Sequence, residues 1–148
     1  MKLSLEKPWT AIALMGGLAL MAPTVAVSAP KPGGLCASRT FSVYFAQWRA
    51  EIGPDARAAL TADQQSFKDC DIERVRIVGL AGVKGSTDKN QQLSQKRGDA
   101  VASFLTAAGW RRDRMEIVAL GDKGATRGDA ERPIRRRVRV TVEARPAG

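Results

Sequence analysis

Residues 137–143, RVRVTVE, place a valine at every second position and a charged or hydroxyl-bearing residue between the valines. Successive side chains of a β-strand point to opposite faces of its sheet, so this two-residue period predicts a strand with one apolar and one polar face. The apolar face has to be covered by a second layer of structure. The rest of the chain therefore has to supply that layer.

Three further segments have the composition of strands: residues 41–45, 74–78 and 115–120. Two segments have the three- and four-residue apolar spacing of helices. The first starts around Pro54 and runs to about Lys68, and the second starts at Asn90, a natural N-cap, and ends at Gly109. A polar loop of residues 121–134 precedes the last strand. This order predicts an α/β (α+β) sandwich in which helices pack on one sheet.

The first 29 residues predict a secretory signal peptide, because two early lysines precede a long apolar run and small residues end it at Val27-Ser28-Ala29. A cut after Ala26 and an uncleaved membrane anchor are alternatives, although glycine and proline within the run disfavour a spanning helix. No later stretch is apolar enough to cross a membrane. We expect an exported, periplasmic protein with a short linker at 30–35, a single domain at 36–144 and a tail at 145–148.

The chain has two cysteines, Cys36 and Cys70, and an even pair in an exported protein predicts a disulfide. A closed loop of this size stabilises a fold by roughly 3 to 4 kcal/mol in the chain-entropy model. Lipidation at Cys36 is not expected, because the preceding Gly33-Gly34-Leu35 lacks the pattern of a lipoprotein signal. Two cysteines without any histidine cannot form an ordinary zinc site, so we expect no metal and no cofactor.

The absence of histidine also removes the most common general base and every Ser/His/Asp or Cys/His arrangement. Ser86 and Lys89 match the Ser-x-x-Lys pattern of penicillin-recognising enzymes, but the companion motifs are missing and we interpret the match as chance. Gly79, Gly82 and Gly85 suggest a phosphate-binding loop, yet neither the P-loop nor the dinucleotide motif is present. We therefore expect no enzymatic activity.

The charge of the chain is strongly basic, with 24 lysines and arginines against 15 acidic residues and a formal charge of +9. The most basic stretch contains Arg135, Arg136, Arg137 and Arg139. It fits either a solvated strand edge or an anion-binding rim. Nucleic acid is not the expected anion, because the chain is exported and no aromatic residues alternate with these arginines.

Arg97 lies four residues after Leu93 and four before Val101, so it falls on the apolar stripe of the second predicted helix. A guanidinium that faces inward requires an anionic partner. The partner is either an internal carboxylate, such as Asp99 or Glu116, or a bound ligand.

Several motifs together resemble one known family. They are FSVYF and VRIVG in the first two strands, GS....N..LS..R from Gly85 to Arg97, the segment AVASFLTAAGW, IVALGDK in the third strand, and RRRVRVTV at the end. From Phe41 to about Glu143 the chain is similar to the OmpA-like C-terminal domain of outer-membrane proteins and peptidoglycan-associated lipoproteins. The resemblance implies a β-α-β-α-β-(loop)-β sandwich with one mixed sheet. The positions of the two cysteines also resemble a subgroup of this family.

The resemblance implies a binding site as well. The family binds peptidoglycan non-covalently by gripping the diaminopimelate of the stem peptide with an aspartate, an asparagine and several arginines. The asparagine corresponds to Asn90, the helix arginine to Arg97, and the closing arginines to Arg136 and Arg137. The family aspartate falls on Gly82.

This departure removes the carboxylate that would face the ligand's ammonium group. Truncating one partner of a buried charge pair costs about 2 to 5 kcal/mol. We therefore expect a non-enzymatic periplasmic module that associates with the cell wall through a weakened or altered diaminopimelate site, with Asp88 as a candidate substitute carboxylate. The alternative is a degenerate domain that binds other envelope proteins and no peptidoglycan.

Overall fold

The computed structural model describes residues 36–125 and 135–148. Its elements are β1 (Arg39–Tyr44), α1 (Pro54–Gln65), β2 (Cys70–Gly79), α2 (Thr87–Ala107), the short 3-10 helix η2 (Arg112–Arg114), β3 (Met115–Ala119) and β4 (Arg137–Pro146). The predicted leader and linker, and residues 126–134 of the predicted loop, lie outside the described residues. Within the described part of the chain, no helix is long and apolar enough to span a membrane.

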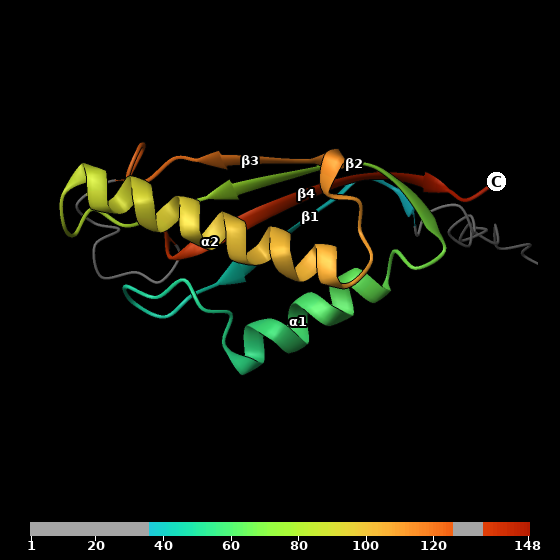
Figure 1. Ribbon diagram of the computed structural model, residues 1–148, viewed down its shortest axis with the longest axis horizontal. Coiled ribbons are helices and arrows are strands. Elements are labelled where there is room, and N and C mark those ends of the chain that lie inside the picture. Colours follow the sequence, from blue (N-terminus) through green and yellow to red (C-terminus); the bar gives the residue numbers. More distant parts are fainter. Residues whose placement is uncertain (1–35, 126–134) are drawn as a thin grey trace, which may run out of the picture.

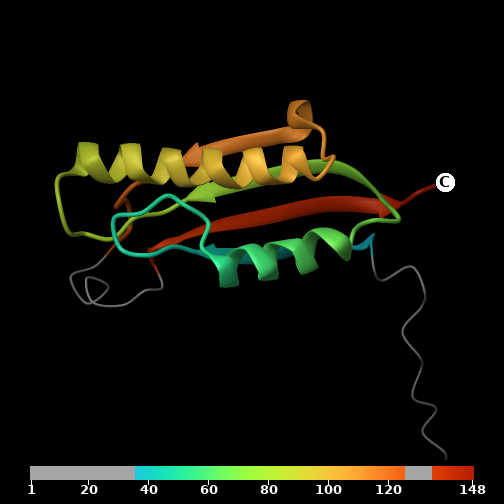
Figure 2. The same ribbon diagram turned by 60° about the horizontal axis from the view of Figure 1, so that its bottom comes forward.

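The four strands form one mixed sheet in the order β1-β4-β2-β3. β4 pairs antiparallel with β1 and with β2, and β3 pairs parallel with β2. Both helices pack on the same face of this sheet, α1 beside β1 and α2 over β2 and β3 (Figures 1 and 2). The predicted architecture, one mixed sheet covered by helices, is confirmed.

β4 lies inside the sheet, between β1 and β2, so the interpretation of its arginines as a solvated strand edge is wrong. The alternation within β4 is confirmed, because Val138, Val140 and Val142 are fully buried while Arg139 is exposed. β4 also continues to Pro146, beyond its predicted end, because its last residues pair with the start of β2. Local periodicity predicted the faces of this strand but not its neighbours.

α1 begins at Pro54 as predicted but ends at Gln65, before Lys68. The backbone N–H groups of the next residues donate to carbonyls three residues earlier, which closes the helix with a turn. Phe67 lies in this turn and packs edge to face against Trp110 in the core. Phe67, which falls within the predicted bounds of this helix, is thus buried but lies outside the observed one.

α2 begins earlier than predicted, because Ser86 and not Asn90 is its N-cap. The Ser86 hydroxyl accepts a hydrogen bond from the backbone N–H of Lys89. Asn90 therefore lies inside the first turns of the helix, where its side chain is buried. At the other end, Gly109 adopts a positive φ of 92° and terminates the helix as predicted.

Two features hold neighbouring segments of the fold close together. The predicted disulfide between Cys36 and Cys70 joins the segment before β1 to the first residue of β2, with a Cα–Cα distance of 5.5 Å. Gly79 at the end of β2 lies directly under α2, since a Cβ atom at this position would be 2.1 Å from the carbonyl oxygen of Ser94. The N-terminal half of α2 is therefore held close to the end of β2.

The loops that follow β1, β2 and β3 lie together with the start of β4 at one end of the sheet, on the left of Figure 1. The C-terminus lies at the opposite end. All the residues predicted to bind a ligand belong to the loop end or to the first half of α2.

Candidate functional site

Arg97 lies near the centre of the loop end and is only 1% exposed. Its Nε donates to the carbonyl oxygen of Arg49 at 2.8 Å, its Nη1 to that of Leu80 at 3.1 Å, and its Nη2 to that of Ala46 at 3.1 Å. The inward orientation predicted from the helical spacing is confirmed. The guanidinium thereby connects α2 to the loop after β1 and to the end of β2.

Neither of the two carboxylates considered for Arg97 is its partner. Asp99 accepts a hydrogen bond from Gln95 on the exposed side of α2, and Glu116 pairs with Arg76 on the sheet. The internal-carboxylate interpretation is therefore wrong, since backbone carbonyls provide the acceptors. Three of the five N–H groups of a guanidinium are used in this way.

The charge of Arg97 is held in an unfavourable environment. Burial lowers the pKa of Arg97 to about 10, and the positive charge of Arg136 acts in the same direction. The guanidinium also lies over the ring of Phe45, with 5.3 Å between its Cζ and the ring centroid. A nearby anion would relieve both the loss of hydration and the repulsion.

Three consecutive arginines surround the same region. Arg135 donates to the carbonyl oxygens of Ala81, Lys123 and Gly124 and so ties the loops after β2 and β3 together. The Nε atoms of Arg136 and Arg137 are buried and have no hydrogen-bond partner among the described residues. The structure thus brings Arg97 and the closing arginines to one place, as the resemblance implied.

Gly82 belongs to the segment that these arginines hold. Arg97 binds the carbonyl of Leu80 and Arg135 that of Ala81, immediately before Gly82. A Cβ atom built on Gly82 would meet no atom within 4 Å. The backbone therefore leaves room for a side chain at position 82, on which the resemblance places the family aspartate. The substitute considered for it, Asp88, is exposed in the first turn of α2.

Asn90 has a different partner from any that the sequence suggested. Its Nδ2 donates to a carboxylate oxygen of Asp122 at 3.2 Å, and the hydroxyl of Thr87 donates to the same oxygen at 3.3 Å. Asp122 follows β3 and was not predicted as a site residue. In the sequence, Asp122 is marked only by its place in the polar stretch GDK after the third strand. No local pattern predicts that Asp122 lies beside the start of α2.

The Ser86 and Lys89 pair has a structural role. The hydroxyl of Ser86 caps α2 by accepting from the backbone of Lys89, and both residues belong to the helix start, not to a loop ahead of it. Among the described residues, no group of histidine, cysteine, aspartate and glutamate side chains could hold a metal ion.

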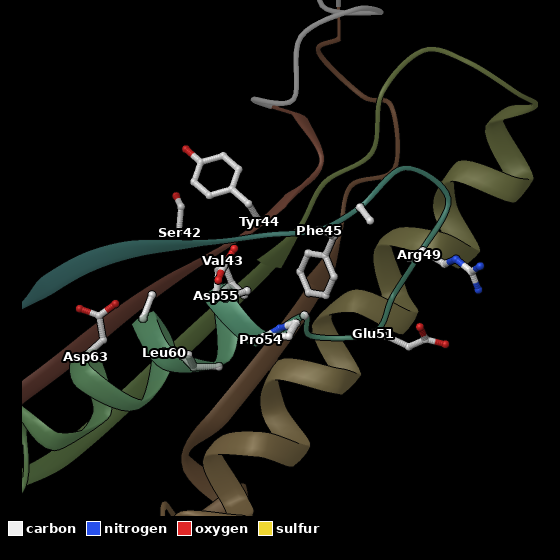
Figure 3. A pocket seen from close by; sticks show the side chains of 14 residues that line it. Ser42, Val43, Tyr44, Phe45, Arg49, Glu51, Pro54, Asp55, Leu60 and Asp63 are labelled. Carbon is white, nitrogen blue, oxygen red and sulfur yellow. The ribbon is translucent and has the colours of Figure 1, made fainter.

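A separate groove of about 490 Å³ lies between β1, α1 and the loop that joins them. Figure 3 shows Val43 and Phe45 pointing from β1 toward α1, whereas Ser42 and Tyr44 point to the other side of the strand. The groove also carries three carboxylates, those of Glu51, Asp55 and Asp63. Burial raises the pKa of the Asp63 carboxyl, against the opposing effect of Arg39.

β1 is the outermost strand on its side of the sheet, so within the described residues its outer edge pairs with no other strand. The backbone N–H of Phe45 donates inward to the carbonyl of Arg136. In an antiparallel pair the hydrogen-bonded residues alternate along the strand. The backbone groups of Ser42 and Tyr44 therefore point outward, along the edge of the groove.

Comparison with known proteins agrees with this geometry. A profile of the OmpA family matches residues 44–139. The outer-membrane lipoprotein YfiB of Pseudomonas aeruginosa is 31% identical over 96 residues, which are 63% of this chain and 57% of that protein. The chain therefore corresponds to little more than half of YfiB.

Solved structures of similar domains have the same fold. The OmpA-like domain of FopA1 from Francisella tularensis superposes with a TM-score of 0.63 at 25% identity, covering 74% of this chain and 73% of that one. The peptidoglycan-associated lipoprotein from Burkholderia pseudomallei gives a TM-score of 0.56 at 26% identity, covering 70% of this chain and 89% of that one. Since the family profile covers well over half of the sequence and the fold agrees, the chain belongs to the OmpA family.

Proposed function

We propose that this protein is a non-enzymatic module of the cell envelope that associates non-covalently with peptidoglycan through an altered diaminopimelate site. Family membership supports the periplasmic location, since the relatives include an outer-membrane lipoprotein and a peptidoglycan-associated lipoprotein. The observation that carries the proposal is the cluster of arginines at the loop end.

The arginine cluster fits the anionic part of a stem peptide. Arg136 and Arg137 are half-buried cations whose Nε donors have no partner among the described residues, and charge-assisted hydrogen bonds from a guanidinium to a carboxylate are stronger than neutral ones. The charge of Arg97 is close enough to that of Arg136 for the two to repel each other. Arg97 therefore adds to the positive potential at this end of the sheet. We expect the ligand's carboxylates to bind here.

The ammonium end of diaminopimelate has no carboxylate to meet at position 82. The Asp122 carboxylate lies at this end of the sheet, but Asn90 and Thr87 already donate to it. We therefore expect the protein to bind stem peptides mainly through their carboxylates. Such binding weakens as salt increases, because exposed charge interactions are screened within about 10 Å at 0.1 M ionic strength.

The test is co-sedimentation with purified sacculi, at low and high salt, for the parent protein, Gly82→Asp and Gly82→Asn. The open space at Gly82 admits either side chain, so the two variants differ in charge and not in size. Gly82→Asp is expected to tighten binding about tenfold or more, equivalent to about 1.4 kcal/mol, and to make it resistant to salt. Gly82→Asn is expected to resemble the parent.

Absence of the parent and of Gly82→Asp from the sacculus pellet at every salt concentration would reject peptidoglycan binding.

The alternative, a protein-interaction domain, has its own support in the groove beside β1. That groove carries three carboxylates, although the chain as a whole has a formal charge of +9. It lies beside the outer edge of β1, which pairs with no other strand among the described residues and could pair with an extended basic segment of a partner protein. In that case, envelope proteins recovered by cross-linking should be lost in an Asp55→Asn, Asp63→Asn variant.

A further inference from the structure

Trp48 is the one non-glycine residue with a positive φ, 57°, among the residues that the structure describes. The left-handed conformation is unfavourable for an L-residue, and such strain persists only where the surrounding structure holds it. The indole is also 50% exposed, although it is one of the largest apolar side chains. The backbone of Trp48 is therefore strained, and its aromatic side chain is half exposed to solvent.

Two neighbours keep this aromatic surface in place. Arg97 donates to the carbonyl oxygens of Ala46 and Arg49, which bracket Trp48 in the chain. Gly85 lies against the ring, because a Cβ atom built there would be 2.9 Å from Cη2 of Trp48. The indole is therefore positioned before any ligand arrives, and the buried arginine is what positions it.

Trp48 forms one wall of a shallow depression of about 300 Å³, and the exposed side of α2 forms the other. Lys89, Gln92, Leu93 and Lys96 have the spacing of one helical face and all line this depression. Leu93 is half-buried, while the two lysines and the Gln92 amide are exposed. The depression thus combines an aromatic ring, an apolar base, an amide and two cations.

The charge of the depression is positive. Arg49, Lys89 and Lys96 are cationic and Glu51 is the one acidic residue that lines it. A volume near 300 Å³ lies at the small end of the range for ligand pockets. A pyranose has an apolar face of C–H groups that can stack on an indole, and its hydroxyl and acetamido groups can bond to an amide and to ammonium groups.

We propose that this depression binds the glycan strand of peptidoglycan, through the apolar face and the acetamido group of an N-acetylated amino sugar. The proposal rests on the peptidoglycan function proposed above and adds to it a second contact. The loop that carries Trp48 is held by Arg97, the buried member of the arginine cluster. A wall fragment would place its sugar on Trp48 and its stem peptide toward Arg136 and Arg137.

The experiment separates sugar from peptide. The probes are glycan strands from which an amidase has removed the stem peptides, free stem peptide, and uncharged chitotetraose. Binding to the exported protein is measured by titration calorimetry and by tryptophan fluorescence. A change in fluorescence on binding is assigned to the depression if the Trp48→Phe variant no longer shows it. The variants are Trp48→Ala, Lys89→Gln with Lys96→Gln, and Tyr44→Ala as the control, since Tyr44 is equally exposed and does not line the depression.

Stripped glycan strands are expected to bind the parent and to change its fluorescence. Trp48→Ala should weaken this binding at least tenfold and leave the affinity for free stem peptide within twofold, while Tyr44→Ala should change neither. The double lysine variant should weaken the binding of stripped strands and of chitotetraose alike, because both carry the acetamido and hydroxyl oxygens to which the ammonium groups would donate.

Three results would overturn the inference. If free stem peptide binds but stripped glycan does not, the depression is not a sugar site and the proposed function stands without it. If stripped glycan binds equally well to Trp48→Ala, the sugar lies elsewhere. If sacculi, stem peptide and glycan all fail to bind, the inference and the proposed function fall together.

Discussion

Replacing Arg97 by methionine tests what the buried guanidinium does. The substitution keeps a long side chain and removes three donors from the carbonyl groups of Ala46, Arg49 and Leu80. Hydrogen bonds to a charged group contribute about 1.5 to 3 kcal/mol each, which gives a gross loss of roughly 5 to 9 kcal/mol. These bonds are expected to break together, since one planar group makes all three.

The cost of burying the charge reduces this loss. Burial, together with the charge of Arg136, lowers the pKa of Arg97 well below its ordinary value, to about 10. A pKa difference of 1 corresponds to about 1.4 kcal/mol, so removing the buried charge recovers roughly 3 kcal/mol. The net destabilisation expected for Arg97→Met is therefore about 2 to 6 kcal/mol.

The assay is urea denaturation of the exported protein at neutral pH, followed by circular dichroism. Lys96→Met is the matched control, because it removes a positive charge from the adjacent, exposed position of the same helix and should change stability by less than about 0.5 kcal/mol. A change below about 1 kcal/mol for Arg97→Met would refute the carbonyl clamp. If stability were unchanged but sacculus binding lost, Arg97 would be a ligand-binding residue and not a structural one.

Two further predictions concern stability alone. Replacing Cys36 and Cys70 by serine should lower the free energy of unfolding by about 3 to 4 kcal/mol, measured with urea under oxidising conditions, and reducing agent should then destabilise only the parent. Hydrogen bonding from Arg145, with the added charge of Arg114, holds the pKa of the Asp71 carboxyl below its ordinary value of 3.8. Its contribution is therefore present above pH 3.8 and is lost as the pH falls through the lower folded-state pKa. The stability difference between the parent and Asp71→Asn should disappear over that acid range, and a difference independent of pH would contradict the role of this charge.

Periodicity predicted the elements better than their ends. The four strands and two helices are present, because each one carries its own apolar pattern. The start of α2 was misplaced because Ser86 and Asn90 are both good N-caps, and the apolar spacing that follows is compatible with either. Asn90 is buried against Asp122, a partner 32 positions away that no local pattern could indicate.

In the candidate site, too, local patterns predicted some features and only the tertiary structure revealed the others. The sequence alone determined that Arg97 faces inward, that Arg136 and Arg137 stand at the start of a strand, and that position 82 has no carboxylate. Only the tertiary structure decided that Arg97 binds backbone carbonyls, that β4 is a central strand, and that Trp48 meets Lys89 and Lys96. The reason is physical: a side chain's direction follows from the period of its own helix or strand, whereas its partners come from chain segments brought together by packing.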